Sequence, residues 1–221
     1  MGLVGVREAA GRLGVSPRRV RQMIADRRLP ARRVGRAWAI DEHAIKPSAR
    51  RPAHRPWKPA SAWAVLAAVD SGQAPPQMPA HERHRARERA AEGLYAVAGR
   101  LSERAERRCF YAHPADLVRI LEDPGAVRAG PSAAADHGID LVGTGPEEAY
   151  VSESALARIV AACHIEERSE RPNLVLRVVA DADWPFPQGA EVVPPVVAAV
   201  DLLESDDERA RRAAEQILDG R

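Results

Sequence analysis

One stretch near the N-terminus decides how the first part of the chain folds: Glu8-Ala9-Ala10-Gly11-Arg12-Leu13-Gly14-Val15-Ser16-Pro17-Arg18-Arg19-Val20. Val6, Ala9, Ala10 and Leu13 recur at three- and four-residue spacing, which predicts an amphipathic helix. Gly14 follows the last apolar residue, where glycine adopts a left-handed cap conformation at low cost. Ser16 can cap a second helix and Pro17 fits its first position. Two helices across so tight a turn form a helix-turn-helix unit, whose second helix enters the DNA major groove.

The second helix of this pattern has two distinct faces when it is turned by 100° per residue. Its apolar side, which would pack on the first helix, consists of Val20, Met23 and Ile24. Arg18 and Gln22 point away from that side, and Arg19 and Arg21 flank them. An outward arginine and glutamine suit guanine and adenine edges in the major groove. A solvated basic face on an ordinary helical hairpin is the alternative interpretation.

A strand–turn–strand pattern follows at residues 32–40. Gly35 can adopt the positive φ of a tight hairpin turn. Val34, Trp38 and Ile40 are predicted to share one apolar face, because alternate residues of a strand point to the same side.

The same hairpin would carry basic residues toward phosphates. Arg36 is expected at the tip of a small wing, with Arg32 and Arg33 near its base. Asp41 is expected to cap a third short helix at residues 42–46.

These elements occur in the order Glu-Ala-Ala, Leu-Gly-Val-Ser, Leu-Pro-Ala and Gly-Arg-Ala-Trp. With them, residues 3–46 resemble the excisionase and MerR-type winged helix-turn-helix family. The resemblance implies binding of double-stranded DNA through Arg18, Arg19 and Gln22, with the wing on the backbone. The full set of candidate DNA-binding residues is Ser16, Pro17, Arg18, Arg19, Arg21, Gln22, Arg32, Arg33 and Arg36. We expect no catalytic residue, metal ligand or cofactor.

Charge divides the chain into a basic head and an acidic body. Residues 1–60 contain 15 Lys and Arg against 4 acids, a net charge of +11, whereas residues 61–221 carry −9. A basic head predicts DNA binding with a steep salt dependence, because neutralised phosphates release counterions. The acidic body should be repelled by DNA, which favours self-association, a partner protein such as a cognate toxin, or exposure to solvent.

Composition limits the remaining possibilities. The chain has 221 residues and 45% hydrophobic content, enough for one large domain or two modest domains with packed cores. It has no apolar run that could span a bilayer and no secretory leader pattern, so a cytoplasmic protein is expected. Cys109 and Cys163 stand far apart, which suits reduced thiols.

The predicted domains are a winged helix-turn-helix at residues 1–46, a basic Pro-rich linker at 47–60 and an acidic domain at 61–221. The linker contains four prolines between residues 47 and 59, a density that favours an extended chain. A DNA-contacting arm is the alternative role for it. The whole chain is expected to be mainly α with short β elements, an α+β protein.

Within the body the apolar pattern predicts alternating helices and short strands. The expected helices are residues 61–69, 81–107, 114–121, 132–137, 153–162, 195–203 and 207–218, the last capped by Ser205. The expected strands are residues 109–112 and 174–179. Ala90, Leu94, Val97 and Leu101 would form a seam on the long second helix, either at a dimer contact or within its own domain.

The end of the body resembles AbiEi-type antitoxins of type IV toxin–antitoxin pairs. The resemblance rests on Leu176-Arg177-Val178-Val179, Trp184-Pro185-Phe186 and Val196-Val197-Ala198-Ala199-Val200 with the acidic segment after it, and more loosely on residues 130–138. It implies a winged-helix head that represses its own operon and an acidic part that opposes a nucleotidyltransferase toxin. The head departs from that family, since it is excisionase-like.

Several other patterns favour ordinary structural roles. His81 and His84 have metal-ligand spacing but no completing ligand, so a solvated face is expected. Cys163 and His164 fit a buried thiol and a helix-end imidazole. The acids Asp181 and Asp183, and those from 201 to 208, lack the Lys or Gly-Ser element of a magnesium-dependent enzyme, so solvation at loops and helix ends is expected. The segment 143–145 is interpreted as a turn.

The sequence therefore favours a non-enzymatic, sequence-specific DNA-binding transcriptional regulator, in particular an antitoxin that represses its own operon. An excisionase-like architectural factor for a recombinase is an alternative, although such factors are usually little more than the head. A nucleotide-acting enzyme targeted to DNA by the head is the alternative from another class.

Overall fold

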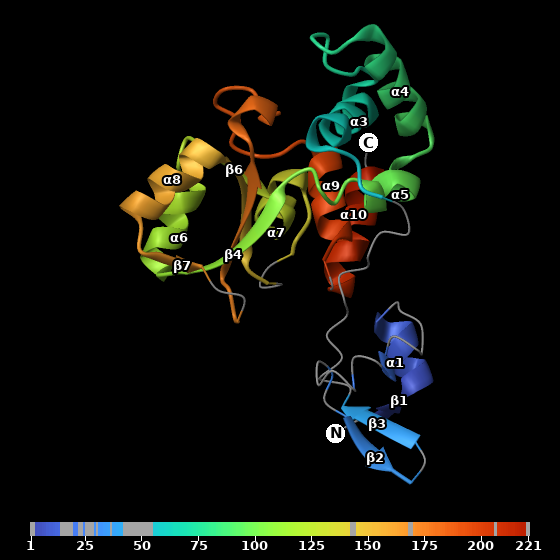
Figure 1. Cartoon of the computed structure of the whole chain (residues 1–221). Coiled ribbons are helices and arrows are strands. Elements are labelled where there is room, and N and C mark those ends of the chain that lie inside the picture. Colours follow the sequence, from blue (N-terminus) through green and yellow to red (C-terminus); the bar gives the residue numbers. More distant parts are fainter. Residues whose placement is uncertain are drawn as a thin grey trace. The chain divides into compact units, whose positions relative to one another are not determined.

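The structure is a computed structural model that describes residues 3–13, 20, 21, 24, 29, 31–35, 37–41, 55–141, 145–167, 170–205 and 207–219 (Figure 1). The chain divides into two compact units, Met1–Ala53 and His54–Arg221. This division falls inside the Pro-rich stretch, and the predicted domain limits stay a prediction. The predicted helix at residue 42–46 lies outside the described residues.

The N-terminal unit combines one helix with a small antiparallel sheet. Its elements are β1 (Leu3–Gly5), α1 (Val6–Leu13), β2 (Ala31–Val34) and β3 (Ala37–Asp41), with strand order β1-β3-β2. Its core consists of Val4, Ala9, Ala10, Val20, Leu29 and Ile40, with Val6, Ile24 and Ala31 packed against them. The predicted amphipathic helix is confirmed by this packing, as is the inward position of Val20 and Ile24.

The predicted hairpin is also confirmed. β2 pairs with β3 in antiparallel register, and Gly35 adopts a φ of +60° directly after β2. Positive φ is easily reached only by glycine, so this position needs that residue.

The apolar face predicted for the hairpin is wrong at Val34. The register pairs Val34 with Ala37 and Arg33 with Trp38, and directly paired residues share a face. Because only two positions separate the strands, the alternation changes phase across the turn. Arg33 therefore shares the face of Trp38 and Ile40, and Val34 lies on the other face with 55% exposure.

The C-terminal unit is built on a mixed five-stranded sheet with the order β5-β6-β8-β4-β7. Its strands are β4 (Glu106–Ala112), β5 (Ala126–Ala129), β6 (Glu147–Ser152), β7 (Ile165–Glu167) and β8 (Leu174–Val179). Its helices are α3 (Pro59–Ser71), α4 (Ala80–Ala91), α5 (Leu94–Val97), α6 (Pro114–Leu121), α7 (Gly130–Ala134), α8 (Glu153–Ala162), α9 (Pro195–Leu203) and α10 (Glu208–Asp219), with short 3-10 turns η2 (Ala98–Arg100), η3 (Ala135–His137) and η4 (Asp181–Asp183). β6 and β8 are parallel and the other neighbours are antiparallel. The α+β class expected from the sequence is confirmed.

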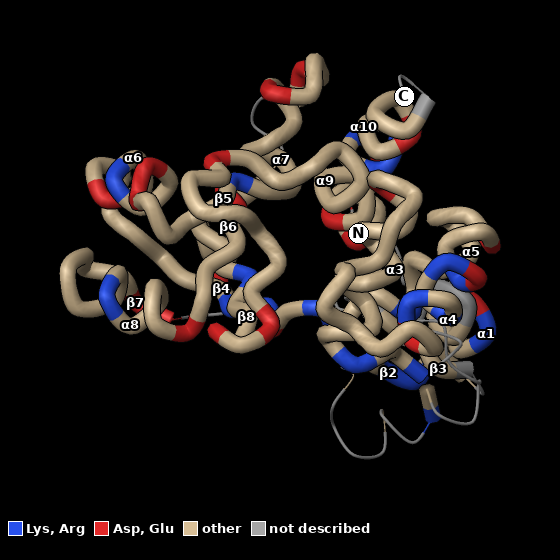
Figure 2. Tube along the Cα trace, turned by 90° about the horizontal axis from the view of Figure 1, so that it is seen from above, with Lys and Arg blue, Asp and Glu red and all other residues tan. Residues whose placement is uncertain are grey.

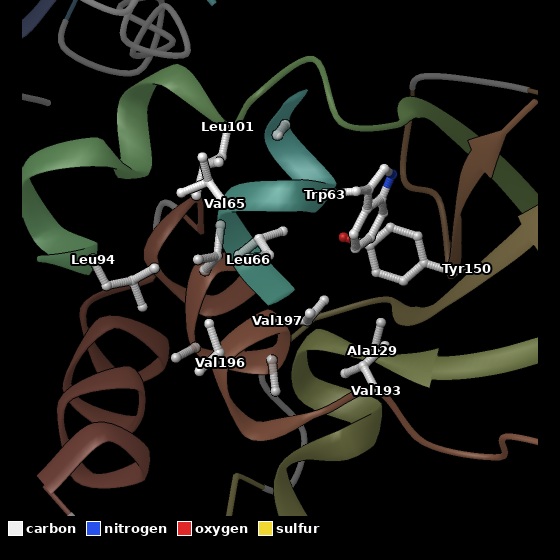
Figure 3. Close-up of a cluster of buried hydrophobic side chains, with 14 of the residues drawn as sticks. Trp63, Val65, Leu66, Leu94, Leu101, Ala129, Tyr150, Val193, Val196 and Val197 are labelled. Atoms are coloured by element: carbon white, nitrogen blue, oxygen red, sulfur yellow. The ribbon is translucent and has the colours of Figure 1, made fainter. Parts of the chain in front are cut away.

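Helices cover this sheet from two sides (Figure 1). On one side α6 and α8 pack on Leu174, Leu176 and Val178 of β8. On the other side Tyr150 and Val179 join a second core with α3, α7 and α9 (Figure 3). Alternation along the strands, with apolar residues on both faces, explains this two-sided burial.

Several elements begin and end where the sequence predicts. The structure places α6, α9 and β8 at the predicted residues. The Ser152 hydroxyl accepts a hydrogen bond from the Ala155 N–H at 3.2 Å, which confirms it as the cap of α8. For α10 the cap is Asp207, which accepts from the Arg209 N–H at 2.9 Å, and Ser205 instead accepts from the Asp207 N–H at 3.1 Å. The expected helix at 61–69 begins two residues earlier, because Pro59 fits the first helical position.

The long helix predicted at residues 81–107 is wrong. The chain leaves α4 at Gly93, whose φ is +87°, continues through α5 and η2, and enters β4 at Glu106. Leu94, Val97 and Leu101 are buried in the core of their own unit. Their spacing arises from separate short turns that face one core, so they form no exposed seam for a dimer contact.

No helix among the described residues has the length and apolar character to cross a membrane.

Candidate nucleic-acid interface

The candidate DNA-binding residues that the structure describes are all exposed. They are Arg21, directly after the buried Val20, and Arg32 and Arg33 on β2. The remaining candidates lie outside the described residues, namely Ser16, Pro17, Arg18, Arg19, Gln22 and Arg36.

Val20 and Ile24 face the core of the N-terminal unit. Val20 is fully buried in the same cluster as Ala9 and Ala10, and Ile24 packs against that cluster. Residues four apart share a helix face, so these two side chains face the core together. Arg21 is exposed beside Val20.

The two arginines of β2 point to opposite faces of the hairpin. The Cζ atom of Arg33 lies 5.9 Å from the centroid of the Trp38 ring, within range of a cation–π interaction. Arg32 is paired with Ala39 on the other face. Trp38 is therefore a partly exposed platform for Arg33 and lies outside the core cluster that contains Ile40.

Charge in the C-terminal unit is unevenly distributed along the chain. Residues 55–100 contain 7 Lys and Arg against 4 acids, whereas residues 101–221 contain 13 against 23. Arg83, Arg85, Arg87 and Arg89 all lie on α4, where Figure 2 shows Lys and Arg close together. The body that the sequence predicts to be acidic in total thus includes a basic helix.

Asp201 on α9 and Glu204 directly after this helix form an ionic cluster with buried arginines, which corrects the expected solvation for these two acids. Asp201 is fully buried, and its carboxylate binds Arg104 and accepts the Tyr150 hydroxyl at 2.7 Å. Glu204 binds Arg104 at 2.5 Å and Arg177 at 2.8 Å. These cations come from other elements far away in sequence, so a local pattern gives no sign of them.

Opposing effects set the pKa values in this cluster. Burial raises the pKa of Glu204, but Arg104 and Arg177 outweigh it and lower this pKa to about 2. Glu148 binds Arg177 at 3.1 Å, and there burial dominates and raises the pKa. The cluster joins α9 to the sheet, and Asp201 Oδ2 has no hydrogen-bond partner among the described residues.

The remaining His and Asp residues that the sequence offers as metal ligands do not come together in the described part of the structure. His81 and His84 are exposed on α4, with His84 3.4 Å from Glu88. Asp181 accepts hydrogen bonds from the Ser154 hydroxyl and N–H, and those from Ser154 and Ser152 lower its pKa. In the described part of the chain no three His, Cys, Asp or Glu side chains come together as metal ligands.

The two cysteines are free, as expected, with Cys163 buried and Cys109 partly exposed. The segment 143–145 lies largely outside the described residues. A surface depression of about 610 Å³ is lined by Ser132 and Glu147 among others. The Ser132 hydroxyl binds the Glu147 carboxylate and also accepts the Glu148 N–H at 2.8 Å, so it is fixed by structural contacts.

Comparison with known proteins gives one family match. Residues 3–46 match a family model described as a helix-turn-helix domain. No curated protein and no solved structure matches the chain. The match confirms the resemblance of residues 3–46, whereas the antitoxin resemblance of the body stays a prediction. Residues 3–46 are a helix-turn-helix domain, which supports a DNA-binding regulatory role for the chain.

Proposed function

We propose that this protein is a sequence-specific DNA-binding transcriptional regulator. The observation that carries the proposal is the helix-turn-helix domain at residues 3–46, together with the buried Val20 that commits one side of the segment after α1 to the core. The net charge of +11 on residues 1–60 supports tight contact with phosphates.

In this proposal the second helix reads bases and the hairpin contacts the backbone. Arg18 and Gln22 face away from the Val20 side by helical rotation and are suited to guanine and adenine edges. Arg36, with Arg32 and Arg33, would contact phosphates, which fix position and carry no sequence information.

Selection of duplexes from a random pool by the full-length protein tests this function. A recovered consensus supports sequence-specific binding, and recovery of unrelated sequences contradicts it. On the selected site, Arg18→Ala and Gln22→Ala should each cost about 1–3 kcal/mol, roughly a 5- to 150-fold loss, with little change on random DNA. Arg211→Ala on α10, an exposed arginine far along the chain, is the matched control.

An equal loss on selected and random DNA would assign Arg18 and Gln22 to phosphates. Arg36→Ala should weaken binding to both DNAs alike and reduce the salt slope by about one.

The specific regulatory role that we propose is an antitoxin that represses its own operon. It is supported by the resemblance of residues 176–212 to AbiEi-type antitoxins. A promoter fusion to the upstream region of the gene should be repressed by the full chain, and Arg18→Ala should release it. Co-expression should also relieve the toxicity of a neighbouring nucleotidyltransferase, and the absence of such relief would remove the antitoxin role while leaving the regulator intact.

We propose that the body has no catalytic activity. The carboxylates that a magnesium-dependent enzyme would need are engaged elsewhere, Asp181 by Ser154 and Asp201 by Arg104 and Tyr150. Incubation with nucleotides and Mg²⁺ or Mn²⁺ should give no turnover. Turnover abolished by Asp181→Ala or Asp183→Ala would overturn this part of the proposal.

A further inference from the structure

The C-terminal unit carries a cluster of cations at its first buried tryptophan. Trp57 is only 8% exposed, and its backbone N–H donates to the Arg100 carbonyl at 2.8 Å. The Cζ atoms of Arg89 and Arg100 lie 4.5 Å and 5.4 Å from the centroid of the Trp57 ring. Arg85, one turn before Arg89 on α4, is exposed. We call Arg85, Arg89 and Arg100 the Trp57 arginine cluster.

The guanidinium group of Arg89 is repelled by those of Arg85 and Arg100. Partial burial lowers the pKa of Arg89, and the neighbouring Arg85 and Arg100 lower it further, while Glu92 is the acid that opposes them. The aromatic ring offsets part of this cost through cation–π attraction. The packing of Trp57 thus holds like charges together.

The three cluster arginines differ from several other arginines of their unit in having no carboxylate partner. Arg104, Arg108, Arg128, Arg158 and Arg177 all form ion pairs with Asp or Glu. Within the described residues, none of the three cluster arginines has an ion pair within 4 Å. An unneutralised group of this kind attracts an anion, and phosphate oxygens are the anions that arginine binds in a bidentate way.

We propose that the Trp57 arginine cluster is a second DNA contact, which binds backbone phosphates of the duplex held by the helix-turn-helix domain. The inference rests on the proposed function. Trp57 stands four residues after Ala53, the last residue of the N-terminal unit, so both basic surfaces belong to one covalent chain. Once one surface is bound, the other meets the same duplex at a high effective concentration.

The arrangement of Trp57 favours a duplex over single-stranded nucleic acid. Proteins that hold single strands offer exposed aromatic faces on which bases stack. Here the ring is buried and two guanidinium groups lie near it, so the contact is electrostatic and insensitive to sequence.

Salt titrations of duplex binding by the full-length protein test the proposal. We would measure fluorescence anisotropy of a labelled 30-base-pair duplex over a series of KCl concentrations. Arg85→Ala/Arg89→Ala should reduce the slope of log affinity against log salt by about 2, because each lost phosphate contact removes about 0.9. The matched control, Arg209→Ala/Arg211→Ala, removes two exposed arginines from α10 and should leave the slope unchanged.

Two further measurements distinguish loss of the phosphate contact from loss of the fold and from binding of RNA. Arg89 contacts Trp57, so if the double variant loses its circular dichroism spectrum, the exposed Arg85→Ala alone should still lower the slope by about 1. Equal slopes for wild type, cluster variants and control variant would overturn the proposal. A cluster effect seen only with a structured RNA of equal charge would also overturn it and indicate an RNA site.

The outcome also separates this proposal from the proposed function. The cluster variants should lose affinity equally on a selected site and on random DNA. If a selected site is found and the affinity for it does not depend on the cluster, sequence-specific regulation is supported and the second DNA contact is refuted. If binding depends on the cluster but no selected site is found, the phosphate contact is supported and sequence-specific regulation is refuted.

Discussion

The buried Arg104 is the position where one substitution should have the largest predictable effect on the C-terminal unit. Its side chain is inaccessible to solvent and donates to the Tyr150 hydroxyl at 2.8 Å and to the Leu101 carbonyl at 2.9 Å, besides its pairs with Asp201 and Glu204. Arg104→Met keeps most of the side-chain volume but removes the charge and every one of these donors.

The structure allows the loss of stability in Arg104→Met to be estimated. Removal of one partner from a buried ion pair costs about 3–5 kcal/mol, because the other charge stays buried without compensation. Arg177 remains 3.5 Å from Asp201 and 2.8 Å from Glu204, so compensation is partly retained. We therefore expect the lower end of the range, about 3 kcal/mol, and a fall in Tm of roughly 10 °C.

Urea unfolding of the full chain, followed by tryptophan fluorescence, measures this loss. The matched control is Arg108→Met, because the Arg108–Glu167 pair is partly exposed, at 31% and 53% of the side chains, and should contribute less than about 1 kcal/mol. Adding Asp201→Asn to Arg104→Met should restore part of the stability, since it removes the uncompensated charge. If Arg104→Met cost no more than Arg108→Met, the reasoning from burial would be refuted.

Three further predictions follow from the same structure. Acid should destabilise the C-terminal unit as the pH falls from about 4.5 toward 2, because Glu204 has a lowered pKa in the folded state and stabilises the fold only while it is ionised. The side chain of Glu204 is 27% exposed, so screening by solvent limits the loss of stability to about 1–2 kcal/mol. Glu204→Gln should make the urea midpoint less dependent on pH. In the N-terminal unit, Ile40→Ala should lower the free energy of unfolding, measured by hydrogen exchange, by about 2–5 kcal/mol, and Trp38→Ala should lower it clearly less, because Ile40 is the fully buried one of the two. A larger loss for Trp38→Ala than for Ile40→Ala would place Trp38 in the core. Ser152→Ala should cost about 1 kcal/mol in thermal unfolding by loss of the α8 cap, and no change would show that the Ala155 N–H finds another partner.

Elements with local signals could be predicted from the sequence. Ser152 before an apolar helical repeat marks the start of α8, and Leu174–Val179, apolar except for Arg177, marks a strand buried on both faces. The exposure of Arg21 also follows from a local rule, since its neighbour Val20 is committed to the core.

Properties that depend on distant partners could not be predicted in this way. Asp201 has the sequence context of an exposed helix end, and only the fold brings Arg104 and Arg177 to it across about 97 and 24 residues. Val34 follows the strand alternation of Trp38, but the two-residue turn changes the phase and puts it on the other face. The Trp57 arginine cluster likewise needs α4 and η2 to meet at one ring.

The positive and negative charges of the chain are unevenly distributed along its sequence. Counted along the sequence, residues 1–100 carry 20 Lys and Arg against 8 acids, and residues 101–221 carry 13 against 23. Most of the positive excess lies in residues 1–60, at +11, whereas residues 61–100 contain 5 Lys and Arg against 4 acids, so the acidic excess of the C-terminal unit begins only after the Trp57 arginine cluster. The acidic sequence after residue 100 is therefore the part of the chain that would repel DNA and that would suit a basic partner protein. A partner that binds the acidic residues would neutralise this repulsion, so partner binding and DNA binding should strengthen each other by the same factor, as linkage requires.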